Sequence, residues 1–240
     1  MDVSMRSLSL LALFSLILLA VAYKIIKKCY GEALKVKDVI DFYKATSPVV
    51  VLIIMLWNHK ESDITCCVYL SMQAAYGLLW CTKSQYYGDH AWDKPFENFA
   101  AFIVCNVVLM ANYSYILALS LHSYQWHPLF LSLCIFIFTI GIFLHFVSDM
   151  QKQTQLKAKP KLIVDGMFTH SRNPNYLGEL CIYGAFNMLA FNAISLLLFG
   201  LLFYVVWWPR MIAKDVSISR YAGFDKYAGS SGFLFPKKLF

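Results

Sequence analysis

The amino-acid sequence predicts an all-α, polytopic membrane protein with about seven transmembrane helices. Of its 240 residues, 59% are hydrophobic and only 15% are charged, and the mean hydropathy is +0.56. Such a composition is typical of membrane proteins rather than of soluble domains. The apolar residues come in long runs separated by polar segments, and the 19 Phe, 15 Tyr and 6 Trp fit the aromatic belts at membrane interfaces.

The first two apolar runs are the shortest. Leu8–Tyr23 spans a bilayer when flanking residues are included, although Ala20-Val-Ala22 also resembles a signal-peptidase site behind a short apolar core. We expect a retained span, with a cleaved signal peptide as the alternative. Ser47–Trp57 corresponds to only about 17 Å of helix. This second span therefore needs Phe42–Thr46 as an extension, with Lys44 snorkelling toward water.

The later apolar runs are longer. Ile64–Thr82, Phe99–Leu121 and Phe130–Val147 each have the length of one membrane span. The run Tyr176–Trp208 is too long for a single crossing and suits a tight helical hairpin that turns near Asn192. Together with the first two runs, these segments bring the expected number of spans to seven.

The distribution of Lys and Arg predicts the orientation of these spans. Segments 24–47, 82–98, 148–175 and 209–240 carry 6, 2, 5 and 6 Lys or Arg, which is 19 of the 21 in the chain. Because basic residues concentrate in cytosolic loops, we expect these segments in the cytosol, the N-terminus in the lumen and the C-terminus in the cytosol. This topology accounts for the net charge of +7, so we predict no nucleic-acid partner. The seven cysteines lack any paired spacing typical of zinc, and we expect no metal site.

A polar sequence, Phe168–Glu179, directly precedes a hydrophobic run. Pro174 favours a first helical turn, so we expect a helix to start near Asn175, with free N–H groups that suit a phosphate. Charged and amide side chains at the edge of a membrane helix usually mark a ligand site. The alternative, a helix start with a snorkelling arginine, accounts for Arg172 but not for Asn175 and Glu179 together.

Two further polar clusters flank this sequence. His145, Asp149 and Lys152 follow each other at helical spacing and would share one helix face, either as part of a site or as an ordinary solvated cluster. After Trp208 the chain alternates charged and apolar residues, which predicts an interfacial helix. Lys237-Lys238 resembles a dilysine signal for retrieval to the endoplasmic reticulum, with two lysines at a charged terminus as the alternative reading.

Several of these motifs, in this order, resemble one known family. They are Asp149 with Gln151-Lys152, Gly166-Met-Phe, Ser171-Arg-Asn-Pro-Asn-Tyr-Leu-Gly-Glu179, Lys214-Asp215, and Arg220–Tyr227 followed by Phe235-Pro236. Residues 130–240 resemble the C-terminal domain of the steroid 5-alpha-reductase and sterol-reductase superfamily. The resemblance implies a seven-helix membrane reductase that binds NADPH in a cytosol-facing cavity, and the dilysine sequence favours the endoplasmic reticulum membrane as its location. Residues 126–240 would form its cofactor-binding domain, and residues 1–125 its N-terminal helices and the lipid-substrate half.

The resemblance also implies roles for individual residues. Asp149 would lie at the adenosine end of NADPH, and Arg172 would face its phosphates. Asn175 and Glu179 would hold the nicotinamide carboxamide, and Tyr227 would close the pocket. The full cofactor-binding set is Asp149, Lys152, Arg172, Asn173, Asn175, Tyr176, Glu179 and Tyr227. The residue types agree with these roles, because an amide needs paired donors and acceptors and phosphates need Arg or Lys.

The expected activity is the reduction of a carbon–carbon double bond in a sterol, polyprenoid or acyl lipid, with no proton donor assigned. Polar residues of the N-terminal half would line a lipid cavity or form interhelical hydrogen bonds: Gln73, Asn106, Asn112, Tyr113 and Tyr115. An S-adenosylmethionine-dependent methyltransferase of the isoprenylcysteine or phospholipid type is the alternative. Those enzymes share an Arg-x-Pro-x-Tyr-x-Gly sequence, which Arg172–Gly178 matches, whereas Asp149 and Glu179 favour the reductase. A non-catalytic lipid-binding protein that keeps the fold is a third reading.

Overall fold

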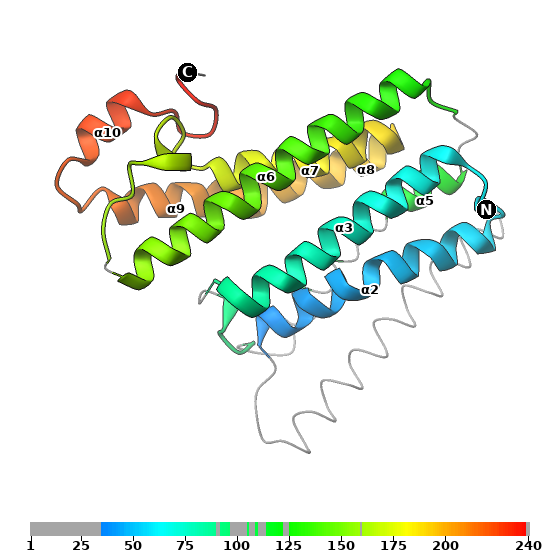
Figure 1. The fold of residues 1–240 in the computed structure, drawn as a ribbon, viewed down its shortest axis with the longest axis horizontal. Helices are drawn as coiled ribbons and strands as arrows, with labels where there is room; N and C mark the ends of the chain where they lie inside the picture. Colours follow the sequence, from blue (N-terminus) through cyan, green and yellow to red (C-terminus); the bar gives the residue numbers. More distant parts are fainter. Residues whose placement is uncertain are drawn as a thin grey trace, which may run out of the picture. The chain divides into compact units, whose positions relative to one another are not determined.

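The computed structural model describes residues 35–89, 92–96, 105, 109, 114–121, 125–158 and 160–238 (Figure 1). Within these ranges the regular structure is helical, and β pairing is limited to two isolated bridges, Lys35 with Pro95 and Ser171 with Gly232. The prediction of an all-α protein is therefore confirmed. The chain divides into two compact units, which we call unit 1 (Met1–Gln125) and unit 2 (Trp126–Phe240).

Unit 1 contains a pair of long packed helices, α2 (Val36–Trp57) and α3 (Ile64–Tyr87) (Figure 1). α2 includes the predicted extension Phe42–Thr46 and begins well before it. The predicted snorkelling of Lys44 is wrong, because its side chain is buried. Its ammonium lies 4.1 Å from the centroid of the Tyr76 ring, so an aromatic face takes the place of water around this cation.

A buried line of polar groups connects the two helices of unit 1. Ser47 Oγ donates to Gln73 Oε1 over 3.2 Å, and Gln73 Nε2 donates to the Tyr69 hydroxyl over 2.8 Å. The Tyr69 ring lies 6.5 Å from that of Tyr115, which belongs to α5 (Ser114–Leu121). Gln73 thus makes the interhelical hydrogen bond considered above, whereas Asn106, Asn112 and Tyr113 lie outside the described residues.

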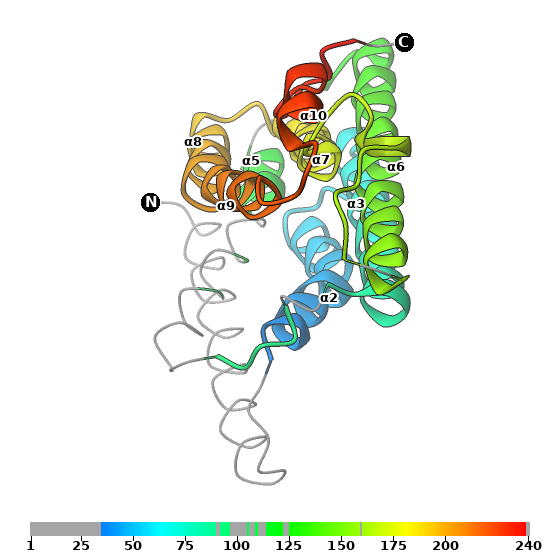
Figure 2. The ribbon, with the colours of Figure 1, turned by 90° about the vertical axis from the view of Figure 1, so that its left-hand side faces the viewer.

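Unit 2 is built on α6 (Pro128–Ala158) and α7 (Pro174–Ala190), which lie side by side (Figures 1 and 2). Two glycines bring their backbones into contact. A Cβ atom at Gly178 would overlap the backbone nitrogen of His145 and lie 2.7 Å from the Gly141 carbonyl oxygen. Only glycine permits this approach, and the crossing places the polar residues of α6 directly against the start of α7.

Both ends of α7 are where the sequence predicts them. Pro174 occupies the first turn, and at the other end Phe191 takes a left-handed conformation with φ of 40°. Asn192 then caps α8 (Ala193–Leu202), because its Oδ1 accepts from the backbone N–H groups of Ile194 and Ser195. The predicted hairpin turn near Asn192 is therefore confirmed.

The helix that follows continues past Trp208, the end of the apolar run, into the segment where the sequence predicts an interfacial helix. A π-helical segment, η4 (Phe203–Trp207), joins α8 to α9 (Trp208–Ile218) without a break. A π segment is rare and changes the rotational position of everything that follows it. The chain then forms a short helix, α10 (Phe224–Ser230), and residues 231–238 return toward the start of α7.

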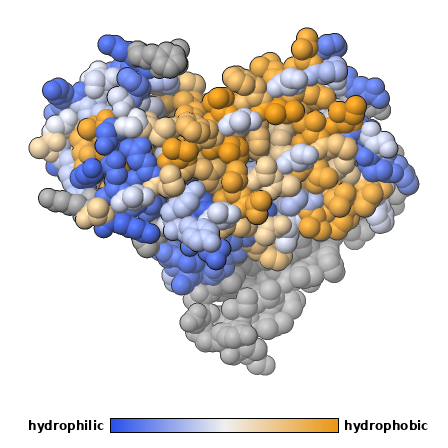
Figure 3. Space-filling view, viewed as in Figure 1, coloured by the Kyte–Doolittle hydropathy of each residue, from blue (hydrophilic) through white to orange (hydrophobic). Residues whose placement is uncertain are grey.

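Four described helices are long and apolar enough to cross a membrane: Val36–Trp57, Ile64–Tyr87, Pro128–Ala158 and the continuous helix Ala193–Ile218. Exposed side chains on α6, from Leu129 to Phe143, are largely hydrophobic, and Figure 3 shows such an apolar surface. These helices are those of a multi-pass membrane protein. The predicted span Leu8–Tyr23 and most of Phe99–Leu121 lie outside the described residues, so the count of seven and the orientation stay predictions.

Candidate functional site

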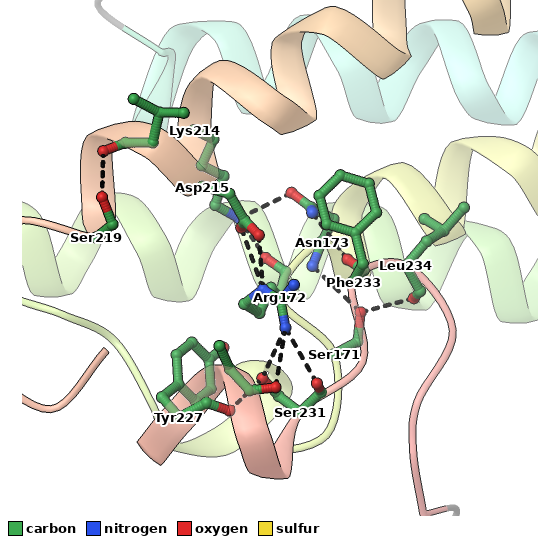
Figure 4. Close-up of polar contacts among 12 residues, drawn as sticks. Ser171, Arg172, Asn173, Lys214, Asp215, Ser219, Tyr227, Ser231, Phe233 and Leu234 are labelled. Atoms are coloured by element: carbon green, nitrogen blue, oxygen red, sulfur yellow. Dashed lines mark hydrogen bonds and ion pairs between the residues drawn. The ribbon is translucent and has the colours of Figure 1, made fainter. Parts of the chain in front are cut away.

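Arg172 lies at the centre of a polar cluster at the start of α7 (Figure 4). We call this set the Arg172 cluster: Ser171, Arg172, Asn173, Lys214, Asp215 and Ser231. Arg172 Nε donates to the two Asp215 carboxylate oxygens over 3.2 and 2.9 Å. Its Nη1 donates to the Ser231 carbonyl over 3.0 Å. The guanidinium therefore ties α7 to α9 and to the end of α10.

The residues after α10 are bound to the start of α7 mainly through backbone groups. The Arg172 N–H donates to the Gly232 carbonyl over 2.8 Å. Asn173 Nδ2 donates to the Phe233 carbonyl over 2.8 Å, and Ser171 Oγ donates to the Leu234 carbonyl over 2.7 Å. These bonds make residues 231–234 a structural part of the cluster.

Lys214 of α9 completes the cluster from the opposite side. Its ammonium donates to the Arg172 carbonyl and to Asn173 Oδ1, the latter over 3.2 Å. With Nδ2 and Oδ1 both bonded, the Asn173 amide serves as an anchor for the chain around it. The charges of Asp149 and Lys152 also act on Lys214, which relates the Arg172 cluster to the end of α6.

A second polar group lies where α6 meets α7, and we call it the His145 cluster: His145, Asp149, Lys152, Asn175 and Glu179. His145 Nδ1 lies 3.3 Å from the Asn175 carbonyl oxygen and 3.7 Å from Glu179 Oε1. On the same helix, Lys152 Nζ lies 3.6 Å from Asp149 Oδ1. His145 thus contacts the predicted ligand residues of α7, while Asp149 and Lys152 lie beside each other further along the same helix.

Asn175 carries the clearest signal of a ligand. Its Oδ1 is buried and accepts no hydrogen bond from any residue that the structure describes. A buried acceptor without a partner costs about 1–3 kcal/mol, and such groups in native proteins call for an explanation. A ligand N–H group or an ordered water would supply the missing donor.

The two predicted tyrosines have different surroundings. The Tyr176 ring lies 6.4 Å from that of Trp207, which is the last residue of the π segment. The Tyr227 hydroxyl donates to the Phe168 carbonyl over 2.7 Å and is buried. Burial raises the pKa of Tyr227 to about 12, so this side chain stays neutral and holds the turn η3 (Gly166–Phe168) against α10.

Five residues of these clusters were not in the predicted cofactor set: His145, Ser171, Lys214, Asp215 and Ser231. The sequence groups His145 with Asp149 and Lys152, but nothing in the sequence shows that α7 faces it. Lys214 and Asp215 occur among the motifs of the family resemblance, but their partners lie more than 40 positions earlier in the chain. Among the described residues, no group of three or more His, Cys, Asp or Glu could hold a metal ion.

Comparisons with known proteins identify the family. A family model described as "Protein of unknown function (DUF1295)" matches residues 29–220. This range covers most of the chain and contains the whole His145 cluster together with Arg172, Lys214 and Asp215. No curated protein and no solved structure matches the chain. The protein belongs to the DUF1295 family.

Proposed function

We propose that this protein is a membrane-embedded, NADPH-dependent reductase of a carbon–carbon double bond in a sterol, polyprenoid or acyl lipid, located in the endoplasmic reticulum membrane. One observation carries the proposal: the Oδ1 of Asn175, one helical turn before Glu179 on α7, is buried and accepts no hydrogen bond from the part of the chain that the structure describes. When bound, the cofactor would supply a hydride to the lipid.

The residues of the His145 cluster fit the carboxamide of a nicotinamide. A carboxamide presents an NH₂ group with two donors and a carbonyl that accepts. Asn175 Oδ1 would accept one of the N–H groups, and the Asn175 NH₂ would donate to the carbonyl. Glu179, one turn further along α7, would accept the second N–H. An amide ligand would therefore satisfy the acceptor that is orphaned in the protein alone.

The cations nearby suit the phosphates and the adenosine end. Arg172 already donates to Asp215 and to the Ser231 carbonyl, and 11% of its side chain is exposed. Lys152 keeps 21% of its side chain exposed, beside Asp149. We therefore propose Lys152 as the first phosphate contact and Arg172 as the residue that holds the site together. Asp149 would accept hydrogen bonds from the hydroxyl groups of the ribose.

Thermal unfolding of the purified protein in detergent, with NADPH, NADH or S-adenosylmethionine added, tests this proposal. A ligand at 100 times its Kd stabilises the folded protein by roughly 2.7 kcal/mol. At about 2–4 °C per kcal/mol for a chain of this size, Tm should rise by roughly 5–11 °C with NADPH. Glu179→Gln should abolish the rise, whereas Glu61→Gln, the same change at an exposed residue of the α2–α3 loop, should leave it intact.

The methyltransferase alternative makes the opposite prediction in the same experiment. Arg172, Pro174, Tyr176 and Gly178 fit its sequence pattern equally well. If S-adenosylmethionine raises Tm and NADPH does not, the reductase proposal is wrong, and methyl transfer to a lipid or prenyl thioether becomes the activity to assay. If neither cofactor changes Tm, both enzymatic readings fail and a lipid-binding role takes their place.

A further inference from the structure

His145 is a buried histidine whose role is not assigned by the proposed function. Its side chain is 2% exposed, and Nδ1 lies within 3.3 Å of the Asn175 carbonyl oxygen. A backbone carbonyl can only accept, so Nδ1 carries the proton. The same nitrogen lies 3.7 Å from Glu179 Oε1, within ion-pair range but beyond hydrogen-bond distance. His145 of α6 therefore contacts the backbone of one residue of α7 and lies beside the carboxylate of another, and these are the two residues assigned to the nicotinamide carboxamide.

The surroundings of His145 leave its ring little freedom. The backbone of His145 touches α7 at Gly178, where a Cβ atom would lie 2.9 Å from His145 Cα. The imidazole also meets the Phe146 ring edge to face, with centroids 4.8 Å apart. A side chain whose position is fixed by packing can fix the position of its partners, because the contact then costs little conformational entropy.

We propose that His145 is a positioning residue for the ligand-binding face of α7. Its Nδ1–H donates to the Asn175 carbonyl and attracts the Glu179 carboxylate electrostatically, so that the first turn of α7 and Glu179 are in place before the cofactor arrives. This inference rests on the proposed function, since it assigns His145 to the same site. It adds one prediction to the proposed function: loss of the Nδ1–H donor of His145, with an aromatic ring kept in its place, weakens NADPH binding.

Two substitutions separate the donor from the ring. His145→Asn keeps an N–H group near the position of Nδ1, whereas His145→Phe keeps an aromatic ring and removes the donor. We expect His145→Phe to weaken NADPH binding by up to about tenfold, the upper end of the effect expected for one lost hydrogen bond. His145→Asn should stay within about threefold of the wild-type Kd. Equal Kd values for the two variants would overturn the proposal.

A control variant separates positioning from stability. Phe138→Ala removes a ring that packs against Phe186 of α7, with centroids 5.7 Å apart, in the same helix pair. It should lower Tm by several degrees and leave the Kd for NADPH unchanged. If Phe138→Ala weakens NADPH binding as much as His145→Phe does, His145 acts only through the stability of the α6–α7 pair and the proposal fails.

A double-mutant cycle with Glu179→Gln gives the decisive result. If His145 acts through Glu179, His145→Phe should weaken NADPH binding much less in the Glu179→Gln variant than in the wild type, because residue 179 has then already lost its charge. Additive losses would overturn the proposal. If the wild type binds S-adenosylmethionine instead of NADPH, the proposed function fails while the same cycle, measured with that ligand, still decides the role of His145. Binding of neither ligand would refute both.

Discussion

Replacing Gly178 by alanine is the sharpest test of how the candidate site is built. The backbones of α6 and α7 touch at this position, so an added Cβ meets main-chain atoms that cannot rotate away. It would overlap the His145 nitrogen and lie 2.7 Å from the Gly141 carbonyl oxygen, whereas ordinary contact begins at 3.4 Å. The helices would have to separate by at least the difference between these two distances.

The structure allows the size of the effect to be bounded. Overpacking of a tightly packed interface costs about 1–3 kcal/mol. Alanine also gains up to about 1 kcal/mol over glycine in a helix, which opposes this cost. Gly184, on the same helix, has nothing within 4 Å of its added Cβ. Gly184→Ala therefore reports the propensity gain alone, and the two variants should differ in stability by about 1–3 kcal/mol.

Thermal unfolding in detergent, measured side by side on wild type, Gly178→Ala and Gly184→Ala, checks this expectation. For a chain of this length the two variants should differ in Tm by about 2–12 °C, with Gly178→Ala the lower. The Kd for NADPH should also rise in Gly178→Ala, since His145 moves away from Glu179. If Gly178→Ala proves as stable as Gly184→Ala, the two backbones are not in contact and the reasoning from the crossing is refuted.

Three further substitutions test other contacts of the same unit. Tyr227→Phe leaves the buried Phe168 carbonyl without its donor and should lower the free energy of unfolding by about 1–3 kcal/mol in a denaturant titration. Because the folded-state pKa of Tyr227 is raised to about 12, the stability that the neutral hydroxyl contributes is complete below pH 10 and is lost as pH rises toward 12. The Tyr227→Phe variant should not show this loss. Arg172→Lys removes the Nε contact with Asp215 and should destabilise the protein by about 1–3 kcal/mol. If the two residues are coupled, the same substitution should destabilise the Asp215→Asn variant by less. Asn192→Ala removes the cap of α8 and should lower the stability by about 1 kcal/mol, whereas an unchanged Tm would contradict the capping role.

Local rules predict both ends of α7 well. Pro174 fixes a helix start and Asn192 fixes a turn because each acts through its own backbone or through groups two or three residues away. The π segment Phe203–Trp207 could not be predicted, since no residue in it forbids an ordinary α-helix. Its geometry is consistent with the aromatic contacts of Trp207, which packs against rings on α7 such as Tyr183.

The candidate site is predictable only in part. The polar residues from Arg172 to Glu179 stand out because they are costly beside a membrane helix. Their partners are not visible in the sequence, because Asp215 lies 43 positions from Arg172, and the rest of α6 and the loop that contains η3 separate His145 from the start of α7. The glycines of α7 also do not predict the helix crossing at Gly178, because Gly184 on the same helix has no atom within 4 Å of its added Cβ. Contact partners depend on the packing of whole helices, which local patterns do not encode.

The crossing at Gly141 and Gly178 also determines which parts of unit 2 can move. Backbone contact leaves no side chains to rearrange, so α6 and α7 should behave as one rigid body. The chain around Arg172 is held differently, by an ion pair and by single hydrogen bonds that it donates to carbonyl groups of residues 231–234. Such bonds can be exchanged for water one at a time. The polar groups around Arg172 should therefore become accessible by release of α10 and residues 231–234, and amide hydrogen exchange should be fast there while the amides near the crossing remain protected.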